Sequence, residues 1–412
     1  MSDRHVAYAL IGGGLAAGNC ARWLRESGAD GSILLIGRES DLPYNRPPCS
    51  KGYLQGKESR EDVLFRPVQW YEDQQIEALT RVSAMKLDPA EKVVTLSNRE
   101  TISFDQALVA TGANVKRVNV EGSELEGIHY LRALGNSDAI RGDAAGKRVV
   151  LIGGSYIASE VAASLTELGS ECTLVMLEPV VLSRGFGETA GRFFQDRLEE
   201  HGITVYGDDA LERFEGADGR VSRVITKAGH ALEADAVVMG TGAMPDVMLA
   251  RAAGLELGES GGIAVDAGLQ TSAPGIYAAG DVAEYESVVH GGRRMRIEHW
   301  DVAFNQGKTA ALNMLGRNQP HEVVPYFFSD LSDWASLEYV GPAHEWDQEV
   351  VRGSTEDGEF IIFYMHDGRV AGALSVGRSE DLEHARRLLA AGTAVGDRVD
   401  ELADLSTDLA AV

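Results

Sequence analysis

The stretch HVAYALIGGGLAAGNCARWLRESG, residues 5–28, predicts how the N-terminal part of the chain folds. An apolar run ends in a glycine turn, and a helix with apolar faces follows and stops at Gly28. A second apolar strand occupies residues 32–37, so the order is that of a β-α-β unit. The turn, Gly12-x-Gly14-x-x-Ala17, has the spacing of a dinucleotide-binding loop. In such a loop the first glycine makes the tight turn, the second lets the backbone approach a pyrophosphate, and the small third residue lets the helix pack on the strand.

An acidic residue follows the second strand where loops of this kind bind a ribose. Glu39 lies 27 residues after Gly12 (39 − 12), and its carboxylate can accept a hydrogen bond from a ribose hydroxyl. The first amides of the helix would face the phosphates. We therefore expect a first dinucleotide site made of small residues and this acid, namely Gly12, Gly14, Ala16, Ala17 and Glu39.

A single glycine turn is also typical of ordinary loops, but the pattern recurs 141 residues later (153 − 12). The sequence KRVVLIGGSYIASEVAASLTELGSECTLVMLEP, residues 147–179, again predicts strand, turn, helix and strand, and two such units predict two bound dinucleotides. Ser155 stands where the first unit has its middle glycine. Its side chain keeps the backbone farther from the pyrophosphate, although its hydroxyl can donate to a phosphate. The residues expected at this second site are Gly153, Ser155, Tyr156 and Ile157.

Composition and charge exclude several classes of protein. The 412 residues suffice for two or three domains, and 38 Lys and Arg against 63 Asp and Glu give a formal net charge of −25. Such a charge repels phosphate backbones and anionic lipid, so neither nucleic acid nor a membrane is an expected partner. The apolar run begins so soon after Met1 that no signal peptide is predicted, and no stretch of about 18 apolar residues occurs. The expected location is cytoplasmic.

The cysteines and histidines predict no metal site. Cys20, Cys49 and Cys172 lie far apart and form no CxxC pair, which also argues against a disulfide framework. The histidines lack the spacing of metal ligands.

The rest of the chain predicts further strands and a change of architecture. Segments 105–113, 233–246 and 275–283 each predict a buried strand that runs into a tight turn. From Val323 onward, aromatic-rich strands and one helix predict a separate α+β domain with a hairpin turn at residues 366–369. The acidic tail after Gly392 is expected to be a loose helix or disordered.

Several motifs together resemble one family. The segment DLPYNRPPCSKGYL, residues 41–54, with GGGLAAG, ATGA, GIYAAGDVA and IEHWDVAFNQG, resembles the FAD-dependent NAD(P)H:ferredoxin reductases of oxygenase systems, the putidaredoxin reductase-like proteins. The first segment also recurs in apoptosis-inducing factor. The resemblance covers residues 5–390 and implies an α/β fold with two doubly wound, glutathione-reductase-like dinucleotide-binding domains and a C-terminal α+β domain. The implied bounds are 1–115 and 246–322 for a split FAD-binding domain, 116–245 for an inserted NAD(H)-binding domain, and 323–412 for the C-terminal domain with its acidic tail.

The resemblance also implies which residues bind FAD. Asp281 ends a buried strand and resembles the family's aspartate on the ribityl and phosphate part of the flavin. Phe328 stands where the family commonly has tryptophan, so it keeps an aromatic wall but lacks an indole donor. The other residues implied to approach the flavin or the nicotinamide lie in short turns and one helix start, namely Ala110, Thr111, Gly112, Gly242, Glu298, His299 and Trp300.

Two basic residues, Arg46 and Lys51, flank the Pro47-Pro48 pair and resemble the family's cations beside the isoalloxazine. A cation there stabilises the negative charge that hydride transfer creates. The resemblance implies that Lys51 pairs with Glu160 and is thereby placed at N5 of the flavin, so Lys51 and Glu160 are the expected catalytic residues. An ion pair that merely joins two domains is the alternative.

The second nucleotide is expected to be NADH. Glu178 follows the strand after the second glycine turn at a spacing that resembles monodehydroascorbate reductase and apoptosis-inducing factor, in which a glutamate meets the adenosine ribose. An acid in this place repels a 2′-phosphate. A charge that simply flanks the helix is the alternative.

The resemblance predicts an FAD flavoprotein oxidoreductase that takes hydride from NADH and passes electrons to an acceptor, a [2Fe–2S] ferredoxin before other small acceptors. Because ferredoxins are usually acidic, a local basic patch is expected, with Arg293, Arg294 and Arg296 as candidates. Two alternatives stay open: an NADH- and redox-sensing flavoprotein similar to apoptosis-inducing factor, and a peroxidase or disulfide reductase that uses Cys49. A homodimer is compatible with the same sequence.

Overall fold

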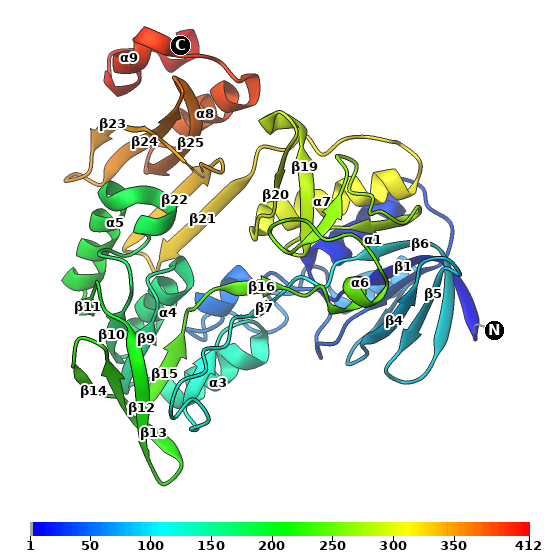
Figure 1. Cartoon of the computed structure of the whole chain (residues 1–412), viewed down its shortest axis with the longest axis horizontal. Coiled ribbons are helices and arrows are strands. Elements are labelled where there is room, and N and C mark those ends of the chain that lie inside the picture. The colour runs from blue at the N-terminus through cyan, green and yellow to red at the C-terminus, as the bar shows by residue number, and fades with distance from the viewer. Residues whose placement is uncertain (1–2, 344) are drawn as a thin grey trace. The chain divides into compact units, whose positions relative to one another are not determined.

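The structure, a computed structural model, describes residues 3–343 and 345–412 and separates into two compact units (Figure 1). Unit 1 contains Met1–Asn45, Glu61–Asn114 and Ala243–Pro325, and unit 2 contains Arg46–Arg60, Val115–Gly242 and Tyr326–Val412. The chain passes from unit 1 to unit 2 within β7 (Ala113–Val115) and returns at β16 (Ala243–Pro245). The three predicted domain boundaries stay a prediction, and the first two residues of the predicted segment 1–115 lie outside the described part of the chain.

A mixed sheet forms the centre of unit 1. Its order is β3-β2-β1-β6-β5-β4, with β18 also paired to β6. Strands β1, β2, β3, β6 and β18 run parallel, and β4 and β5 are antiparallel. The bounds are β1 Arg4–Ile11, β2 Ile33–Ile36, β3 Ile76–Leu79, β4 Ala84–Asp88, β5 Val93–Leu96, β6 Thr101–Val109 and β18 Ile276–Ala278. All four residues of β2 are buried, as in a parallel strand covered on both faces.

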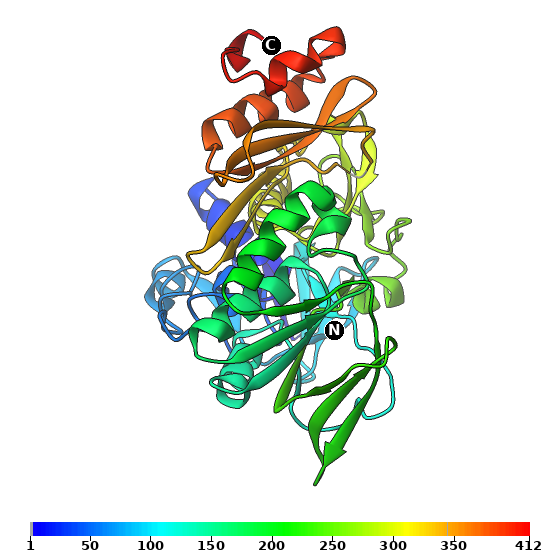
Figure 2. The ribbon, with the colours of Figure 1, turned by 90° about the vertical axis from the view of Figure 1, so that its left-hand side faces the viewer.

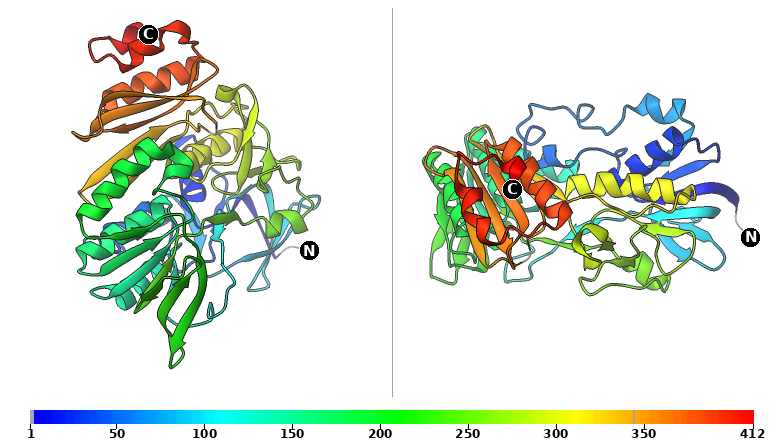
Figure 3. Two further views of the ribbon diagram at one scale, coloured as in Figure 1. Left: turned by 60° about the vertical axis from the view of Figure 1, so that its left-hand side comes forward. Right: turned by 90° about the horizontal axis from the view of Figure 1, so that it is seen from above.

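Helices cover this sheet. Helix α1 (Leu15–Glu26) packs beside α7 (Trp300–Met314), as the blue and yellow helices of Figure 3 show. A smaller sheet of order β17-β19-β20 completes unit 1. The remaining bounds are α2 Val68–Asp73, α6 Met248–Ala252, β17 Ile263–Val265, β19 Ala283–Ser287 and β20 Arg293–Met295.

Unit 2 contains a second parallel sheet of order β11-β10-β9-β15-β8. Its bounds are β8 Ile128–Tyr130, β9 Arg148–Ile152, β10 Glu171–Val175, β11 Thr204–Tyr206 and β15 Ala236–Met239. The helices are α3 (Leu134–Ala144), α4 (Tyr156–Glu167) and α5 (Ser183–Glu200), the last interrupted at Gly187. Figure 2 shows an antiparallel hairpin that extends beyond this sheet; it consists of β12 Leu211–Ala217 and β13 Arg220–Thr226, and β14 Ala231–Glu233 pairs with β13.

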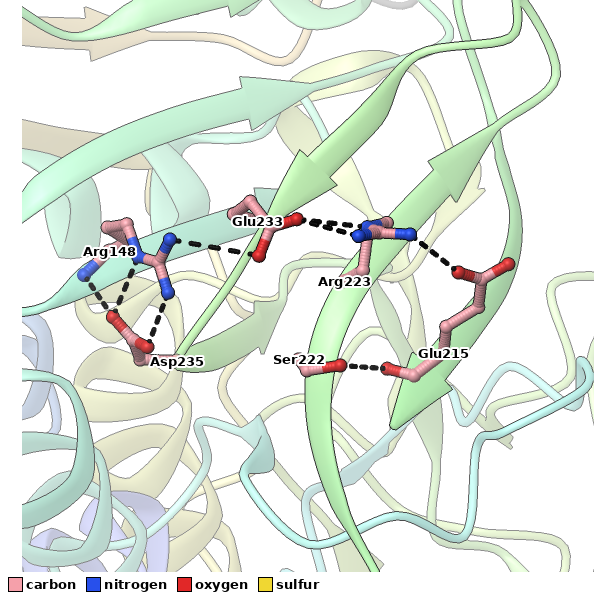
Figure 4. A network of polar contacts seen from close by, with 6 residues as sticks. All are labelled: Arg148, Glu215, Ser222, Arg223, Glu233 and Asp235. Atoms are coloured by element: carbon pink, nitrogen blue, oxygen red, sulfur yellow. Dashed lines mark hydrogen bonds and ion pairs between the residues drawn. The ribbon is translucent and has the colours of Figure 1, made fainter. Parts of the chain in front are cut away.

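An exposed ion-pair network ties this hairpin to the parallel sheet (Figure 4). Arg148, the first residue of β9, donates to Asp235 at 2.8 Å, and this hydrogen bond is the main reason that the pKa of Asp235 falls to about 2. Farther along, Arg223 of β13 donates to Glu233 at 2.9 Å and contacts Glu215 of β12 at 3.3 Å. The network therefore joins the starts of two parallel strands to the antiparallel strands beside them.

The C-terminal part of unit 2 is an antiparallel sheet of order β21-β22-β25-β24-β23 with one helix, α8 (Ser379–Ala391). The strands are β21 Tyr326–Leu331, β22 Ala335–Val340, β23 Gln348–Ser354, β24 Glu359–His366 and β25 Arg369–Val376. The predicted hairpin is confirmed: the two residues between β24 and β25, Asp367 and Gly368, have φ values of 49° and 70°, as a type I′ turn requires. The predicted fold class is confirmed as well.

The acidic tail is ordered, so its prediction as a disordered segment is wrong and its prediction as a helix is closer. Helix α9 (Val399–Ala403) and a short 3-10 turn bury Leu402 and Leu409 completely or almost completely. The buried guanidinium of Arg352 donates to the carbonyls of Asp404 and Thr407. These contacts give the tail apolar burial and satisfied hydrogen bonds that its acidic composition does not reveal. Over the described residues, the helices are all too short or too polar to cross a membrane.

Candidate cofactor and nucleotide sites

The first glycine turn lies at the carboxyl ends of β1 and β6 in unit 1. Gly12 has a φ of +141°, and a Cβ on it would lie 2.1 Å from the carbonyl oxygen of Ala110. Only glycine fits there, because both the conformation and the neighbouring backbone exclude a side chain. The amide of Ala110 donates in turn to Ile11 at 2.7 Å. The predicted site residues Gly12 and Ala110 are thus brought together by backbone contact.

Gly14 is the N-cap residue of α1, and a Cβ on it would meet nothing within 4 Å. The open space therefore lies at the N-terminus of a helix, where free amides and the helix dipole favour a phosphate. Ala17, one turn into α1, is fully buried, so the small third residue packs as expected.

Helix α7 and the loop after β18 close around the same turn. A Cβ on Gly307 would lie 2.4 Å from the carbonyl oxygen of Ala16, so α7 approaches α1 at backbone distance. The amide of Gly280 donates to Oε1 of the buried Gln306 at 2.8 Å. A Cβ on Gly280 would lie 3.3 Å from that of Ala16, which brings Asp281 to the glycine turn. Sequence reasoning missed Gln306 and Gly307, although both lie in the quoted motif IEHWDVAFNQG.

Glu39 lies just after β2 and is half-buried. It accepts a hydrogen bond from the hydroxyl of Tyr44 at 2.6 Å, a contact that the sequence did not suggest. The neighbouring Arg38 pairs with Asp246 at 2.8 Å. The hydroxyl of Thr111 donates to the carbonyl of Asp246 at 2.7 Å, so Thr111 and Gly112 are held at the end of β6 by the returning chain.

The start of α7 holds the predicted residues Glu298, His299 and Trp300. His299 is the N-cap residue, and Trp300 donates to Asn45 at 3.1 Å and stacks on Phe304. Glu298 pairs with Arg296, which also donates to the carbonyl of Asp281 at 3.0 Å. Arg296 is therefore engaged within unit 1 and only 15% exposed, so its expected place in a surface docking patch is wrong.

Arg293 and Arg294 lie on β20 and are exposed. Arg294 opposes Glu286 in the sheet register and donates to the carbonyl of Val265 at 3.3 Å. The docking patch that the sequence suggests is thus reduced to two cations, one of which faces an acid.

The second glycine turn repeats the geometry of the first in unit 2. Gly153 has a φ of +122°, and a Cβ on it would lie 2.3 Å from the carbonyl oxygen of Gly240. Ser155 is the N-cap residue of α4, and its hydroxyl lies 3.4 Å from that same carbonyl oxygen. The half-buried residues Tyr156 and Ile157 follow in the first turn of α4.

Glu178 lies against this turn. Its Oε2 would be 3.2 Å from a Cβ on Gly154, and the sulfur of Met176 would be 2.7 Å from it. The carboxylate is therefore next to the glycine loop, where an adenosine ribose would be bound. Gly242, with a φ of +86°, has open space in place of a side chain.

Lys51 and Glu160 form the expected ion pair within unit 2, with Nζ 2.9 Å from Oε1. Glu160, on α4, is 3% exposed and accepts hydrogen bonds from Ser50 and Ser329, each at 2.5 Å. The Lys51 ammonium also lies 5.0 Å from the ring centre of Phe328. The sequence predicted the pair and the aromatic residue, but it gave no sign of the two serine donors.

The segment that carries Lys51 is anchored to the helices of unit 2. Ser164 of α4 donates to the carbonyl of Ser50 at 2.7 Å, and Ser137 of α3 donates to the carbonyl of Cys49 at 2.9 Å. Arg46 donates to the carbonyl of Arg132 at 2.6 Å. Cys49 is a free thiol and 3% exposed, and this burial opposes the redox role considered for it.

Comparison with known proteins decides the family. The model of the pyridine nucleotide-disulphide oxidoreductases matches residues 6–307, and that of the reductase C-terminal domain matches residues 326–412. The chain belongs to the pyridine nucleotide-disulphide oxidoreductase family. A ferredoxin–NAD(P)(+) reductase of Sphingomonas sp is 33% identical over 393 residues, which cover 95% of this chain and 94% of that protein.

Two solved structures are similar to this oxidoreductase over nearly its whole length. The ferredoxin reductase for the CYP199A2 system of Rhodopseudomonas palustris has a TM-score of 0.92 at 34% identity and covers 98% of this chain and 99% of its own. The covalent putidaredoxin reductase–putidaredoxin complex has a TM-score of 0.92 at 30% identity and covers 100% of this chain and 98% of its own. The expected resemblance is therefore confirmed.

The oxidoreductase uses FAD and a nicotinamide nucleotide, and its own residues fit both. In unit 1 the pyrophosphate and ribose of FAD fit the open space at Gly14, the carboxylate of Glu39 and the loop at Asp281. In unit 2 the turn at Gly153 and the carboxylate of Glu178 suit a second nucleotide. The described residues contain no cluster of three His, Cys, Asp or Glu side chains able to hold a metal ion.

Proposed function

We propose that this oxidoreductase transfers electrons from NADH through FAD to a [2Fe–2S] ferredoxin. The observation that carries the proposal is that each unit has its own glycine turn, with a first glycine that admits no side chain and an acid placed for a ribose. The similarity to a ferredoxin reductase and to a reductase bound to putidaredoxin supports the acceptor.

Bound FAD accepts hydride and can release electrons singly, which is what a one-electron acceptor requires. Residues of unit 1 would hold it: the amides at the start of α1 would bind the pyrophosphate, Glu39 would accept from the adenosine ribose, and Asp281 would hold the ribityl end. Tyr44 keeps the Glu39 carboxylate in place through its hydrogen bond of 2.6 Å.

Residues of unit 2 hold NADH and discriminate against NADPH. The amides at the start of α4 bind its pyrophosphate, and Glu178 accepts from the two ribose hydroxyls. A 2′-phosphate in this place would meet the negative charge of Glu178. The hydroxyl of Ser155 donates to the Gly240 carbonyl at 3.4 Å, so a phosphate would compete with that carbonyl for the hydroxyl.

Lys51 is proposed to be the cation that acts at the flavin, with Glu160 as the residue that positions it. Its side chain is 18% exposed, and its ammonium lies 2.9 Å from a buried carboxylate and 5.0 Å from the centre of an aromatic ring, so its position is tightly defined. A positive charge held there favours the reduced flavin electrostatically.

The test is an anaerobic titration of the purified protein with NADH, followed by absorbance, and then addition of a [2Fe–2S] ferredoxin. We expect full bleaching by one equivalent of NADH and rapid electron transfer to the ferredoxin, with Arg293→Glu slowing transfer to ferredoxin but not to ferricyanide. A protein that bleaches but passes no electrons to any ferredoxin, and instead changes its oligomeric state, would support the redox-sensing alternative. Loss of turnover in Cys49→Ser would support the thiol alternative.

A further inference from the structure

Helix α5 of unit 2 is broken after its first turn. Gly187 has a φ of 77° and a ψ of 172°, which lie outside the helical range and separate this turn from the main part of the helix. The carbonyl of Phe186, just before the break, accepts a hydrogen bond from the hydroxyl of Tyr364 on β24 at 2.7 Å. Thr189, just after the break, donates to Glu349 on β23 at 2.7 Å. The C-terminal sheet therefore binds both sides of the break.

The hydroxyl of Tyr364 is a permanent donor to the first turn of α5. The side chain is fully buried, and this burial raises the pKa of Tyr364 well above its ordinary value, so the hydroxyl stays protonated. A carbonyl at a helix end has no partner within the helix, and leaving it buried without any partner is costly. The Phe186 ring is also buried and stacks on that of Phe327, with the ring centres 6.1 Å apart. One hydrogen bond and aromatic packing therefore hold this turn.

The first turn of α5 in turn holds the second glycine turn. Its N-cap residue, Leu182, has a φ of 61°, in the left-handed region that leucine rarely adopts. Backbone strain of this kind persists where the surrounding contacts fix it, and it is typical of ligand-binding loops. The carbonyl of Leu182 accepts from the amide of Phe186 at 3.0 Å, and its amide donates to the carbonyl of Gly154 at 2.8 Å. Three hydrogen bonds in series therefore link the hydroxyl of Tyr364 to the carbonyl of Gly154.

The carbonyl of Gly154 and the amide of Ser155 belong to one peptide group. Over the described residues the peptide bonds are all trans, and in a trans peptide the carbonyl and the amide point in opposite directions. The hydrogen bond from Leu182 therefore turns the Ser155 amide to the opposite side. Ser155 is the N-cap residue of α4, where the amides of the first helical turn are available for a phosphate.

We propose that Tyr364 is a positioning residue for the second nucleotide. By fixing the first turn of α5, and with it Leu182, the Tyr364 hydroxyl holds the peptide group before Ser155 in the orientation that binds the pyrophosphate. A site that adopts its binding conformation for only part of the time has an affinity reduced by that fraction. Loss of the hydroxyl leaves a buried carbonyl without its donor and lets the turn sample other conformations, so the affinity falls. The inference rests on the proposed binding of NADH at the second glycine turn.

The experiment measures the Kd of ADP-ribose for the FAD-loaded protein by isothermal titration. ADP-ribose has the pyrophosphate and both riboses of NADH but no nicotinamide, so it reports on unit 2 without any hydride transfer. In Tyr364→Phe the Kd is expected to rise about fivefold, with the FAD content unchanged.

Tyr339→Phe is the matched control. The hydroxyl of Tyr339 is buried in the same sheet, but its hydrogen bond stays within the C-terminal domain, where it accepts from the amide of Ala343 at 2.6 Å. Both variants should lower the thermal midpoint, because each loses a buried hydrogen bond. The control should keep the Kd within about twofold of the wild type.

Hydrogen–deuterium exchange tests the same link in the wild-type protein. Exchange in residues 180–187 is expected to slow when ADP-ribose binds, because the nucleotide fixes the peptide group to which Leu182 donates. In Tyr364→Phe the same segment should exchange faster without nucleotide. Exchange in residues 180–187 that is unchanged while the glycine turn itself becomes protected would overturn the inference.

Glu178→Ala tests the proposed nucleotide site separately. Its carboxylate is placed for the adenosine ribose, so this variant should weaken ADP-ribose binding whatever the role of Tyr364. If the wild-type protein does not bind ADP-ribose, or if Glu178→Ala leaves the Kd unchanged, the second nucleotide site and this inference both fall. If Glu178→Ala raises the Kd but Tyr364→Phe behaves like Tyr339→Phe, the nucleotide site stands and the role of Tyr364 is overturned.

Discussion

The two glycine turns share their first residue and differ in the middle one. Gly12 and Gly153 both have positive φ, and in both a Cβ would collide with the carbonyl oxygen at the end of the neighbouring strand, at 2.1 Å and 2.3 Å. At the middle position Gly14 faces open space, whereas Ser155 places a hydroxyl 3.4 Å from a backbone carbonyl. The fold therefore dictates glycine at the first position of both turns, whereas it leaves room for a side chain at the middle position.

This difference matches the roles proposed for the two nucleotides. FAD stays bound during turnover and gains from close backbone approach to its pyrophosphate. NADH must enter and leave in each cycle, so a looser approach at Ser155 is compatible with function. Substitutions at corresponding positions of the two turns can test this interpretation.

The largest effect is expected from Gly12→Ala and Gly153→Ala. Each adds a Cβ at a forbidden backbone conformation and against a carbonyl oxygen, which should cost at least about 3 kcal/mol of folding free energy. We expect Gly12→Ala to yield protein without FAD, and Gly153→Ala to keep FAD but lose reduction by NADH. Flavin content after acid precipitation and stopped-flow reduction measure the two outcomes. Equal loss of FAD in both variants would contradict a division of labour between the turns.

A smaller effect is expected from exchange of the middle residues. Gly14→Ser adds a side chain to space that only a ligand would use, so it should weaken FAD binding about tenfold or more, ~1.4 kcal/mol per factor of ten, without unfolding the apoprotein. Ser155→Gly should change the Kd for NADH by less than that factor. Isothermal titration of apoprotein with FAD, and of FAD-loaded protein with NADH analogues, checks both. Unchanged FAD affinity in Gly14→Ser would place the pyrophosphate elsewhere.

Glu178→Ala addresses the ribose end of the second turn. Loss of the carboxylate removes a hydrogen-bond acceptor for the ribose of NADH and removes the repulsion of the 2′-phosphate of NADPH. The preference for NADH over NADPH should therefore fall about tenfold, ~1.4 kcal/mol, mainly through KM. Steady-state kinetics with both nucleotides provides the measurement. A wild-type protein that prefers NADPH tenfold would refute the placement of Glu178.

The smallest effect concerns the arginines that begin the two central strands, Arg4 of β1 and Arg148 of β9. Asp235 has a pKa of about 2, well below that of an unfolded aspartate, through its hydrogen bond to Arg148. Its stabilising contribution is present above about pH 4 and is lost as the pH falls toward 2. Its side chain is 39% exposed, so solvent screening limits the contribution to about 1 kcal/mol or less.

Asp235→Asn should therefore lower the thermal midpoint slightly at pH 7 and match the wild type near pH 2. Glu77→Gln is the counterpart in unit 1. There Arg4 pairs with Glu77 at 2.7 Å and with a second acid, Glu100, at 2.8 Å, whereas the second partner of Arg148, Glu233, is 3.8 Å away. We expect an even smaller shift in that variant. An unchanged thermal midpoint of Asp235→Asn at pH 7 would show that the exposed network of Figure 4 adds nothing to the stability of unit 2, and a larger shift in Glu77→Gln than in Asp235→Asn would contradict the expected order of the two variants.

The sequence predicts the local parts of the fold well and the long-range contacts poorly. The glycine spacing and the apolar runs were enough to predict both β-α-β units, because within each unit these signals lie within about 30 residues of each other. The Lys51–Glu160 pair came from the family resemblance and not from any local pattern. The donors Ser50 and Ser329, and the Gln306 side chain that holds Gly280, lie on elements that meet only in the folded chain.

Two errors have the same physical origin. Arg296 looked like a surface cation, but its partners Glu298 and the Asp281 carbonyl become apparent only when α7 and the loop after β18 are packed. The acidic tail was expected to be a loose helix or disordered, but the buried Arg352 supplies a cation that donates to its carbonyls. In both cases the sequence shows the arginine but not the carbonyl groups to which it donates in the folded chain.

The cluster around Glu160 has a consequence for the order of folding. It joins Ser50 and Ser329 to Glu160 across sequence separations of 110 and 169 residues, and Gln55 to Ser332 across 277. Contacts at such separations form late, because the entropy of closing long loops is lost before they contribute any stabilisation. During synthesis the parallel sheet of unit 2 can fold while β21 is still missing, and Glu160 then lacks one of its two hydroxyl donors. Docking of the edge strand β21 on α4 therefore supplies the last of the two hydroxyl donors to Glu160.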